Sequence, residues 1–573
     1  MSSFLWKIGG EAGFGIMTTG LTFSKIASRL GYRVFDYIEY PSLIRGGHNA
    51  FEAIVSDEEV HGLKKEIDFL VCLNKETFEN HKARLTPESY VIYDPDDFEL
   101  DDKYKCVSVP FRKILKEENG ETVMKNTIAL GASLALMSGE ISPLYDIIER
   151  QFARKGESVV SFNKTFAKRG YDYVREKYSK HIVPYLSRKS SPEKQIVLTG
   201  NDAFSLGSIM ADCRFYASYP MTPSSSVLGT LAAWQDKTGI IVRHAEDEIS
   251  VINTALGASF VGARSSVGTS GGGFALMVES VSLAGVTEIP IVIFLSQRPG
   301  PATGMPTWTE QGDLLFAVHA GHGEFPKIVL APGDAYEMIE LTMKAYNLAD
   351  IYQTPVIVMS DMHLSESHKT VPANIVKRLI GDYKIDRGKT ISKVKGETYL
   401  RYKLTDDGIS ERLIPGVKGY FYQANSYEHL EDSHTTEESV PRRKQVDKRN
   451  AKLPTYVTNH FQKPNVYGDL DRSEIVFVAW GSMKGPVLEA LRSLNAKQKS
   501  YALIHFTHVY PLSEEKVRPF FPAGKRYILV ENNSQAQFGR LLRQETGIHI
   551  AEKLLKYDGR PFFQEEIVDY VKK

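Results

Sequence analysis

The sequence predicts an α/β protein built of three blocks, and two patterns lead to that fold class. Between residues 195 and 370, short apolar runs typical of strands alternate with helical stretches, which is the pattern of a parallel sheet with helices on both faces. The chain also begins with a strand, a glycine-rich turn and a helix, and residues 470–573 begin with another apolar strand. A length of 573 residues is enough for about three or four domains.

The first block, residues 1–185, opens with an apolar strand at residues 4–8 and the glycine-rich turn 9–15. A helix through residues 26–30 follows, so this beginning is Rossmann-like. The strict spacing of a dinucleotide-binding turn is not met, because Thr18 stands where the third glycine would be. We therefore predict neither NAD nor FAD as a ligand of this block.

The second block, residues 195–370, carries two motifs in close succession. The first motif is the segment Tyr219-Pro220-Met221-Thr222-Pro223, which follows a short strand. By itself this segment could be a surface turn. The other consists of a short strand at 239–243, expected to be buried, an acidic cluster and the apolar stretch 249–261, which predicts a buried helix; the acids are Glu246, Asp247 and Glu248. The helix dipole alone favours acids in a first turn, but a carboxyl at the mouth of a buried helix also suits proton chemistry.

A third motif begins where the apolar strand 289–295 ends. The loop that follows carries Arg298 and Thr303. In an open α/β sheet, ligands bind beyond the carboxyl ends of the strands, and a guanidinium offers two parallel hydrogen bonds to a carboxylate. The alternative is that Arg298 only holds a loop rich in proline and glycine. The glycine-rich turn 268–274 could let a ligand approach the backbone closely, or could be a plain turn.

These motifs resemble the pyrimidine-side half of the thiamine diphosphate site in the α subunit of 2-oxoacid:ferredoxin oxidoreductases. There the first segment usually reads Tyr-Pro-Ile-Thr-Pro, and Met221 is a near-isosteric replacement of the isoleucine. The resemblance implies that the cofactor is bound by Tyr219, Pro220, Met221, Thr222 and Glu248. It implies that Glu248 is the catalytic acid that hydrogen-bonds the aminopyrimidine ring, with Glu246 as second choice.

The same resemblance implies a substrate side. Arg298 would bind the carboxylate beside the ketone of a 2-oxoacid, and Thr222 would contact the substrate carbonyl. Thr303, in the loop of Arg298, is a further substrate-binding candidate. The expected catalytic set therefore consists of three residues: Glu248, Thr222 and Arg298.

The first block resembles the γ subunit of the same oxidoreductases, so the chain resembles a γ–α fusion. The similar segment is Tyr40-Pro41-Ser42-Leu43-Ile44-Arg45-Gly46-Gly47-His48-Asn49. The resemblance places it near the substrate end of the active site. Arg45, with His48, could then meet the distal carboxylate of a dicarboxylic substrate, or help receive coenzyme A. The alternative is that Arg45 pairs with a surface acid and that His48 is a satisfied loop histidine.

Residues 371–465 are charged and weakly periodic and resemble the family's interdomain segment, with an exposed helix expected over 437–452. We interpret His429 and His434 as solvated loop histidines rather than metal ligands. Residues 470–573 resemble the C-terminal domain of the transketolase superfamily. The implied fold is therefore a Rossmann-like γ domain, a pyrimidine-type thiamine diphosphate domain and a transketolase C-terminal-like domain.

The cysteines point to a partner. Cys72, Cys106 and Cys213 are isolated, whereas an iron–sulfur cluster normally takes four thiolates. The sequence also lacks the Gly-Asp-Gly…Asn pattern of a diphosphate–Mg²⁺ site. A β subunit is therefore expected to supply the diphosphate and Mg²⁺ sites and the [4Fe-4S] cluster, in an (αβ)₂ heterotetramer.

The charge balance and apolar content of the sequence bear on its partners and location. Lys+Arg and Asp+Glu are equal at 70 each, so nothing favours nucleic acid or an anionic membrane as a partner. No apolar run reaches the roughly 18 residues of a spanning helix, and the first residues do not form a signal peptide, so a cytoplasmic location is expected.

The resulting hypothesis is a subunit of an enzyme that converts a 2-oxoacid, coenzyme A and oxidised ferredoxin reversibly into acyl-CoA, CO₂ and reduced ferredoxin. 2-Oxoglutarate is the favoured substrate. The alternatives are a pyruvate- or indolepyruvate-specific member, a thiamine-dependent decarboxylase without ferredoxin, and a non-catalytic scaffold subunit.

Overall fold

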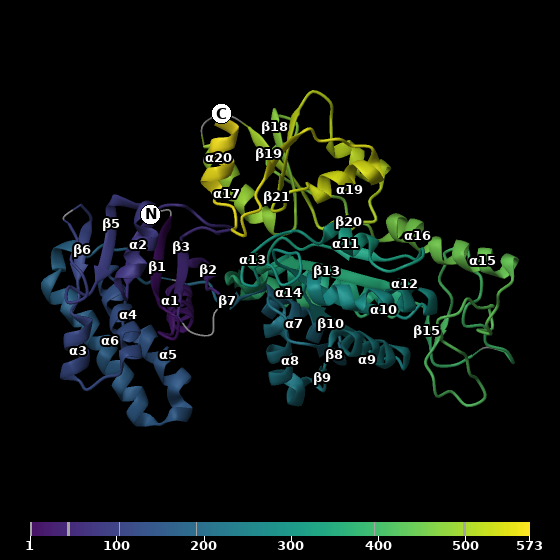
Figure 1. The fold of residues 1–573 in the computed structure, drawn as a ribbon, viewed down its shortest axis with the longest axis horizontal. Helices are drawn as coiled ribbons and strands as arrows, with labels where there is room; N and C mark the ends of the chain where they lie inside the picture. The colour runs from purple at the N-terminus through teal and green to yellow at the C-terminus, as the bar shows by residue number, and fades with distance from the viewer. Residues whose placement is uncertain are drawn as a thin grey trace. The chain divides into compact units, whose positions relative to one another are not determined.

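The computed structural model describes residues 3–42, 46–101, 103–190, 192–394, 396–496 and 500–572. The chain divides into two compact units (Figure 1). The first unit contains residues 1–198, 367–377 and 563–569, and the second contains the remainder.

The first unit is built on an eight-stranded sheet of order β6-β5-β4-β1-β3-β2-β14-β7. The predicted strand, turn and helix at its start are present, and the turn ends at Gly15, whose φ of 73° only glycine adopts readily. Its strands are β1 (Ser3–Glu11), β2 (Arg33–Glu39), β3 (His48–Ser56), β4 (Ile67–Cys72), β5 (Leu85–Tyr93), β6 (Lys105–Ser108), β7 (Gln195–Leu198) and β14 (Lys369–Pro372). Its main helices are α1 (Ile16–Arg29), α2 (Lys75–His81), α3 (Phe111–Glu117), α4 (Lys125–Leu136), α5 (Ser142–Phe152) and α6 (Glu157–Lys177).

The first apolar run of the block predicted over residues 195–370 forms as β7, but it pairs with β14 in the sheet of the first unit. β14 in turn pairs with β2, and the backbone N–H of Val34 donates to Thr370 Oγ1 at 2.9 Å. Pairing between segments so far apart along the chain leaves no trace in a local apolar pattern, so the sequence could not indicate it.

The larger sheet of the second unit has the order β20-β12-β13-β11-β10-β8-β9, and only β20 runs antiparallel to its neighbour. Helix α7 packs on α8 and α12, and α9 packs on α10. The strands are β8 (Phe215–Ser218), β9 (Ile241–His244), β10 (Ser265–Thr269), β11 (Ile291–Gln297), β12 (Ile328–Leu330), β13 (Pro355–Asp361) and β20 (His508–Tyr510). The helices are α7 (Gly200–Met210), α8 (Ser225–Thr238), α9 (Glu248–Phe260), α10 (Gly271–Thr287), α11 (Leu314–His319), α12 (Ala335–Tyr352) and α13 (Met362–Glu366). The predicted α/β class is confirmed.

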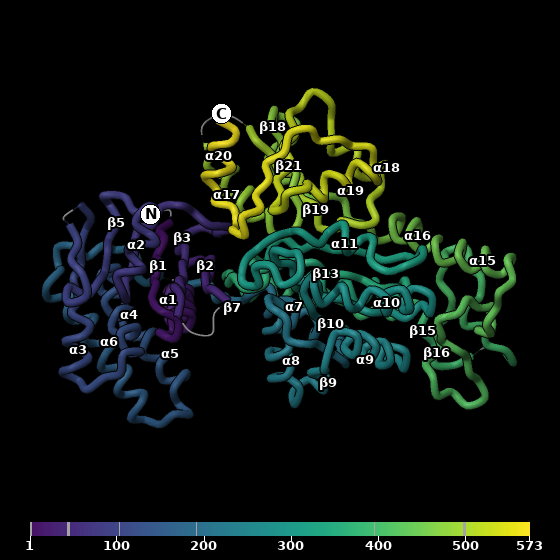
Figure 2. Tube along the Cα trace, in the orientation of Figure 1, coloured from purple at the N-terminus to yellow at the C-terminus, as the bar shows by residue number. Residues whose placement is uncertain are grey.

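The C-terminal block adds a five-stranded sheet of order β17-β19-β18-β21-β22 to the second unit. Its backbone, drawn green to yellow, lies on the teal block that holds the larger sheet (Figure 2). Its elements are β17 (Asn465–Tyr467), β18 (Ile475–Trp480), α17 (Lys484–Asn495), β19 (Tyr501–Phe506), α18 (Glu514–Val517), β21 (Arg526–Glu531), α19 (Gln537–Thr546) and β22 (Glu552–Leu555). The last helix of the chain, α20 (Gln564–Lys572), belongs mostly to the first unit.

The segment between the two sheets of the second unit is more ordered than its composition indicates. It contains α14 (Ala373–Asp382), β15 (Thr390–Ile391), β16 (Arg412–Leu413), α15 (Ser439–Asn450) and α16 (Lys452–Asn459). The expectation of a solvated His429 is wrong: its ring is buried, stacks on Tyr402 at 3.5 Å and places Nε2 3.0 Å from the Val286 carbonyl. His434 is exposed.

Two searches of the described ranges gave no result. No helix there combines the length and apolarity that crossing a membrane requires. No group of three or more His, Cys, Asp or Glu side chains in those ranges is arranged to hold a metal ion.

Candidate functional site

The sequence motifs of the second block meet at one edge of its sheet. Strands β11, β10, β8 and β9 are parallel neighbours, so their carboxyl ends lie side by side. The residues that follow these ends are Arg298 after β11, Ser270 after β10, Tyr219 after β8 and the acidic cluster after β9. Ligands of open α/β sheets bind at such an edge.

The three acids after β9 have different environments. Asp247 is the N-cap of α9, and its Oδ1 accepts a hydrogen bond from the Ser250 N–H at 2.8 Å. Glu246 is exposed. Glu248, the first residue of α9, is 3 % exposed, and within the described residues its Oε1 has no hydrogen-bond partner. A buried carboxylate oxygen without a partner carries a desolvation cost that a ligand donor would remove.

A glycine makes room for this carboxyl. A methyl group on Gly273, in the first turn of α10, would stand 2.4 Å from Glu248 Oε1 and 2.2 Å from Thr269 Oγ1. Both distances are below any normal contact, so Glu248 can occupy its position only beside a residue without a Cβ. The glycine-rich turn after β10 is therefore more than a flexible connection.

The expectation of a buried strand at 239–243 is wrong, because β9 is largely exposed at the edge of its sheet. The expectation of a buried helix over residues 249–261 is met on only one face. Val251, Ile252, Ala255 and Leu256 pack into the unit, whereas Ile249 is 52 % exposed and Val261, which caps α9, is 58 % exposed. Helix α9 is apolar on both faces, as the sequence indicates, but other residues of this chain cover only one of them.

The structure brings Arg298 and Thr222 together. Arg298 donates from Nη1 to the carbonyl oxygen of Thr222 at 2.7 Å. Burial lowers the pKa of the Arg298 guanidinium, and the charge of Asp313 acts in the opposite direction. Thr303 is exposed in the loop after Arg298. Tyr219 and Pro220 are also exposed, and Met221 and Thr222 are half-buried.

Sequence reasoning missed two acids of this site. Burial, reinforced by the charge of Asp313, raises the pKa of Glu310 to about 7. Burial also raises the pKa of Asp313 to about 6, and the charge of Arg298 partly opposes this. The available signal was the presence of two acids in the loop that follows Arg298, but that loop alone does not indicate burial.

In the first unit, His48 begins β3 and contacts a second histidine. Its Nε2 lies 3.0 Å from Nε2 of His81, and its Nδ1 is buried without a partner among the described residues. Burial lowers the pKa of both imidazoles, so the pair is neutral at physiological pH. Arg45 lies outside the described residues.

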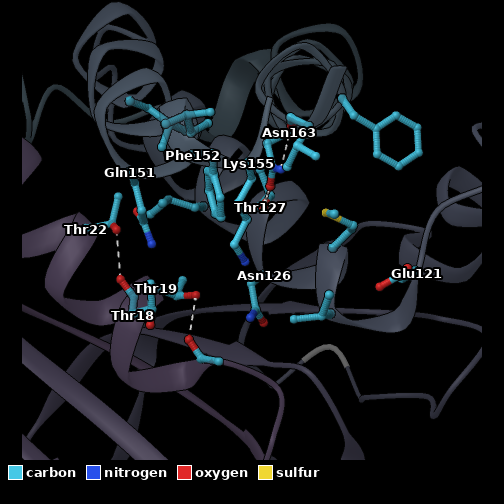
Figure 3. A pocket seen from close by; sticks show the side chains of 18 of the residues that line it. Thr18, Thr19, Thr22, Glu121, Asn126, Thr127, Gln151, Phe152, Lys155 and Asn163 are labelled. Carbon is cyan, nitrogen blue, oxygen red and sulfur yellow. Dashed lines mark hydrogen bonds between the residues drawn. The ribbon is translucent and has the colours of Figure 1, made fainter. Parts of the chain in front are cut away.

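The first unit also contains a cavity of about 720 Å³ between α1, α4, α5 and α6 (Figure 3). Its wall is mixed: threonine hydroxyls, amide groups and apolar side chains such as Phe152 all line it, and Lys155 adds a cation. Asn126 donates from Nδ2 to the Phe14 carbonyl, and within the described residues its buried Oδ1 has no partner. The cavity shares no residue with the site around Glu248.

Two family models match most of the chain. Residues 206–448 match the model described as "Pyruvate flavodoxin/ferredoxin oxidoreductase, thiamine diP-bdg". Residues 5–173 match the model described as "Pyruvate ferredoxin/flavodoxin oxidoreductase".

Curated relatives and a solved structure match over nearly the full length. The 2-oxoacid:ferredoxin oxidoreductase subunit alpha of Sulfolobus sp is 32 % identical over 98 % of this chain and 95 % of its own. The 2-oxoglutarate oxidoreductase subunit KorA of Mycobacterium tuberculosis is 27 % identical over 99 % of this chain and 90 % of its own. The structure of 2-oxoglutarate:ferredoxin oxidoreductase from Magnetococcus marinus, with 2-oxoglutarate, coenzyme A and succinyl-CoA bound, superposes with a TM-score of 0.93. It is 31 % identical, over 100 % of this chain and 99 % of that one.

Proposed function

Because the chain belongs to the family of 2-oxoacid:ferredoxin oxidoreductase α subunits, we propose that it forms the pyrimidine side of a thiamine diphosphate site in such an enzyme. The complex would carry out reversible, coenzyme A-dependent oxidative decarboxylation of a 2-oxoacid, with 2-oxoglutarate favoured, and transfer the electrons to ferredoxin. The observation that carries this proposal is the buried Glu248, whose Oε1 lacks a partner among the described residues and faces Gly273.

The residues after β8 and β9 fit the aminopyrimidine part of the cofactor. Glu248 would accept a hydrogen bond from the ring through Oε1, and residues 219–222 would line the ring. When bound, thiamine diphosphate supplies a nucleophilic carbon that makes decarboxylation of a 2-oxoacid possible. The contribution of this chain is the carboxyl that holds or moves a proton at the ring, in surroundings that exclude water.

Arg298 and Thr222 would form the substrate side. The Arg298 guanidinium is oriented by its hydrogen bond to the Thr222 carbonyl, which leaves donors for the carboxylate beside the ketone. Thr222 would contact the substrate carbonyl. Thr303, in the loop that follows Arg298, would also contact the substrate. Arg45 and His48 would receive the distal carboxylate of a dicarboxylic substrate or help bind coenzyme A.

A β subunit would provide the diphosphate and Mg²⁺ sites and the [4Fe-4S] cluster, in an (αβ)₂ heterotetramer. Burial raises the thiol pKa of both Cys72 and Cys213, which makes these thiols poor cluster ligands. Large apolar side chains are exposed on the elements of the candidate site, as expected of a surface that a partner covers. They are Trp234 on α8, Ile241 on β9, Ile249 on α9 and Leu276 on α10.

The test is reconstitution with the β subunit. The complex is expected to reduce ferredoxin only when thiamine diphosphate, coenzyme A and a 2-oxoacid are all present. A panel of 2-oxoglutarate, pyruvate and indolepyruvate then identifies the substrate. Reduction that does not depend on coenzyme A, or decarboxylation without reduction of ferredoxin, would contradict the proposal.

A further inference from the structure

A second carboxyl contacts the same turn as Glu248. A methyl group on Gly271 would stand 2.4 Å from Asp313 Oδ2, just as one on Gly273 would stand 2.4 Å from Glu248 Oε1. The first turn of α10 therefore lies between two carboxyls. Oδ2 of Asp313 is buried and, like Glu248 Oε1, has no hydrogen-bond partner within the described ranges.

Asp313 is tied to the strand that carries Arg298. The Asp313 N–H donates to Gln297 Oε1 at 2.9 Å, and Gln297 Nε2 donates to the Ser360 carbonyl at 3.0 Å. Gln297 is the last residue of β11 and directly precedes Arg298. The buried side-chain amide of Gln297 thus ties the backbone of Asp313 to the residue that precedes Arg298.

The C-terminal block holds the other side of this loop. The Gln311 N–H donates to the Asn532 carbonyl at 2.7 Å, and Gln311 Nε2 donates to the Trp480 carbonyl at 3.0 Å. Two residues beyond Asp313, the Leu315 N–H donates to Gln537 Oε1 at 3.0 Å. The loop that carries Glu310 and Asp313 is therefore held in place before any substrate arrives.

Three other charged groups on the neighbouring elements make contacts elsewhere. Asp361, at the end of β13, accepts from Ser482 and from the Leu364 N–H. Glu531 accepts from the N–H groups of Phe538 and Gly539, and the Arg560 guanidinium stacks on the Trp308 ring at 3.1 Å. The charge of Arg298 acts on Asp313, and the charge of Asp313 acts on Glu310.

Resting on the proposed function, we propose that Asp313, whose buried Oδ2 lacks a partner among the described residues, balances the charge of Arg298 and acts with Glu310 of the same loop as a positioning residue, so that binding of a 2-oxoacid carboxylate is accompanied by uptake of up to one proton by this pair of acids. The proton comes from solvent, and no bond is made or broken. The substrate carboxylate neutralises Arg298 and adds negative charge beside two acids that cannot both remain ionised there at low cost. The raised pKa values of about 6 and about 7 mean that part of this uptake occurs in the physiological range.

The test is calorimetry on the reconstituted complex loaded with thiamine diphosphate. The probes are N-oxalylglycine and oxamate, which imitate 2-oxoglutarate and pyruvate but are not decarboxylated. Binding is measured near pH 7 in buffers of different ionisation enthalpy. We expect the observed enthalpy to change with the buffer in the direction of proton uptake, and the dissociation constant to rise up to about tenfold from pH 7 to pH 8.

Asp313→Asn is expected to abolish most of the buffer dependence while the probe still binds. Glu310→Gln is the second variant, because the Glu310 side chain makes no hydrogen bond on which the fold depends among those described. The control is Glu324→Gln, an exposed acid in the same unit, which should leave the buffer dependence unchanged. Probe binding without buffer dependence in the unmodified complex would overturn this inference alone. Failure of both probes to bind would overturn the proposed function, and this inference with it.

Discussion

Glu248 and Gly273 occupy one space: the position that a Cβ on Gly273 would take lies 2.4 Å from Oε1 of Glu248. The acid at the start of α9 can therefore hold its carboxyl in this position because the first turn of α10 has a glycine there. A local sequence reading treats the two as separate motifs, but the fold brings them into contact.

This relationship predicts the effect of Gly273→Ala. The added methyl would displace the Glu248 carboxyl and overpack the turn, at a cost of about 1–3 kcal/mol. Thiamine diphosphate binding to the reconstituted complex should weaken, as measured by titration of tryptophan fluorescence or calorimetry. Gly257→Ala is the matched control, because Gly257 lies within α9 with nothing within 4 Å of its added Cβ. Equal losses in both variants would mean that the space beside Glu248 is not what matters.

Glu248→Gln tests the acid itself. Glutamine keeps the shape of the side chain and removes its titratable proton, so turnover should fall by about 10²–10⁴-fold with little loss of stability. Exchange of the C2 proton of bound thiamine, followed by NMR, reports the defect directly. Glu246→Gln is the comparison, and its exposed position predicts turnover near that of the unmodified complex. The assignment to Glu248 fails if proton exchange remains normal in Glu248→Gln.

The chain expressed alone should be colourless, with no iron and no stoichiometric thiamine diphosphate. The three cysteines are isolated in the sequence, and burial raises the thiol pKa of Cys72 and Cys213. Absorbance spectra and iron analysis of the purified chain, compared with the complex, provide the check. A cluster bound to the isolated chain would mean that the proposed division between the subunits is incorrect.

The sequence predicted the strands and motifs of the site well, because an apolar run followed by a polar turn is a local signal. It placed Tyr219–Thr222, Glu248 and Arg298 each after a predicted strand, and in the structure those strands belong to the consecutive series β11, β10, β8 and β9. The sequence does not distinguish a helix that its own chain buries completely from a helix with one exposed apolar face. Ile249 lies on such an exposed face. Both readings produce the same hydrophobic residues.

Contacts between residues far apart in the sequence could not be predicted from local patterns. His48 and His81 are 33 residues apart, and nothing in either segment indicates that their rings meet. Glu310 and Asp313 follow Arg298 in one loop, but Gln311 and Leu315 beside them hydrogen-bond to residues more than 160 positions further along the chain, which a local pattern does not indicate. His429 lies in a segment without periodicity, so its stacking on Tyr402 left no sequence signal.

The last prediction concerns the two arginines and the identity of the substrate. Every 2-oxoacid has a carboxylate beside the ketone, and only a dicarboxylic one has a second. Loss of a charged hydrogen bond typically costs about 1.5–3 kcal/mol, or roughly 10–150-fold in binding. Arg298→Ala should therefore weaken 2-oxoglutarate and pyruvate alike, because we propose that its guanidinium, which donates to the Thr222 carbonyl, binds the carboxylate that both substrates share.

Arg45→Ala should instead weaken 2-oxoglutarate and spare pyruvate, provided that the complex accepts both. Arg45→Lys should recover part of the loss, because lysine supplies the charge without the two parallel hydrogen bonds of a guanidinium. The decisive quantity is the ratio of kcat/KM for the two substrates, measured in the unmodified complex and in both Arg45 variants. An unchanged ratio in Arg45→Ala would show that Arg45 does not bind the distal carboxylate. The preference for a dicarboxylic substrate would then lose the residue that supports it, and Arg45 would be free for the other role considered for it, the reception of coenzyme A.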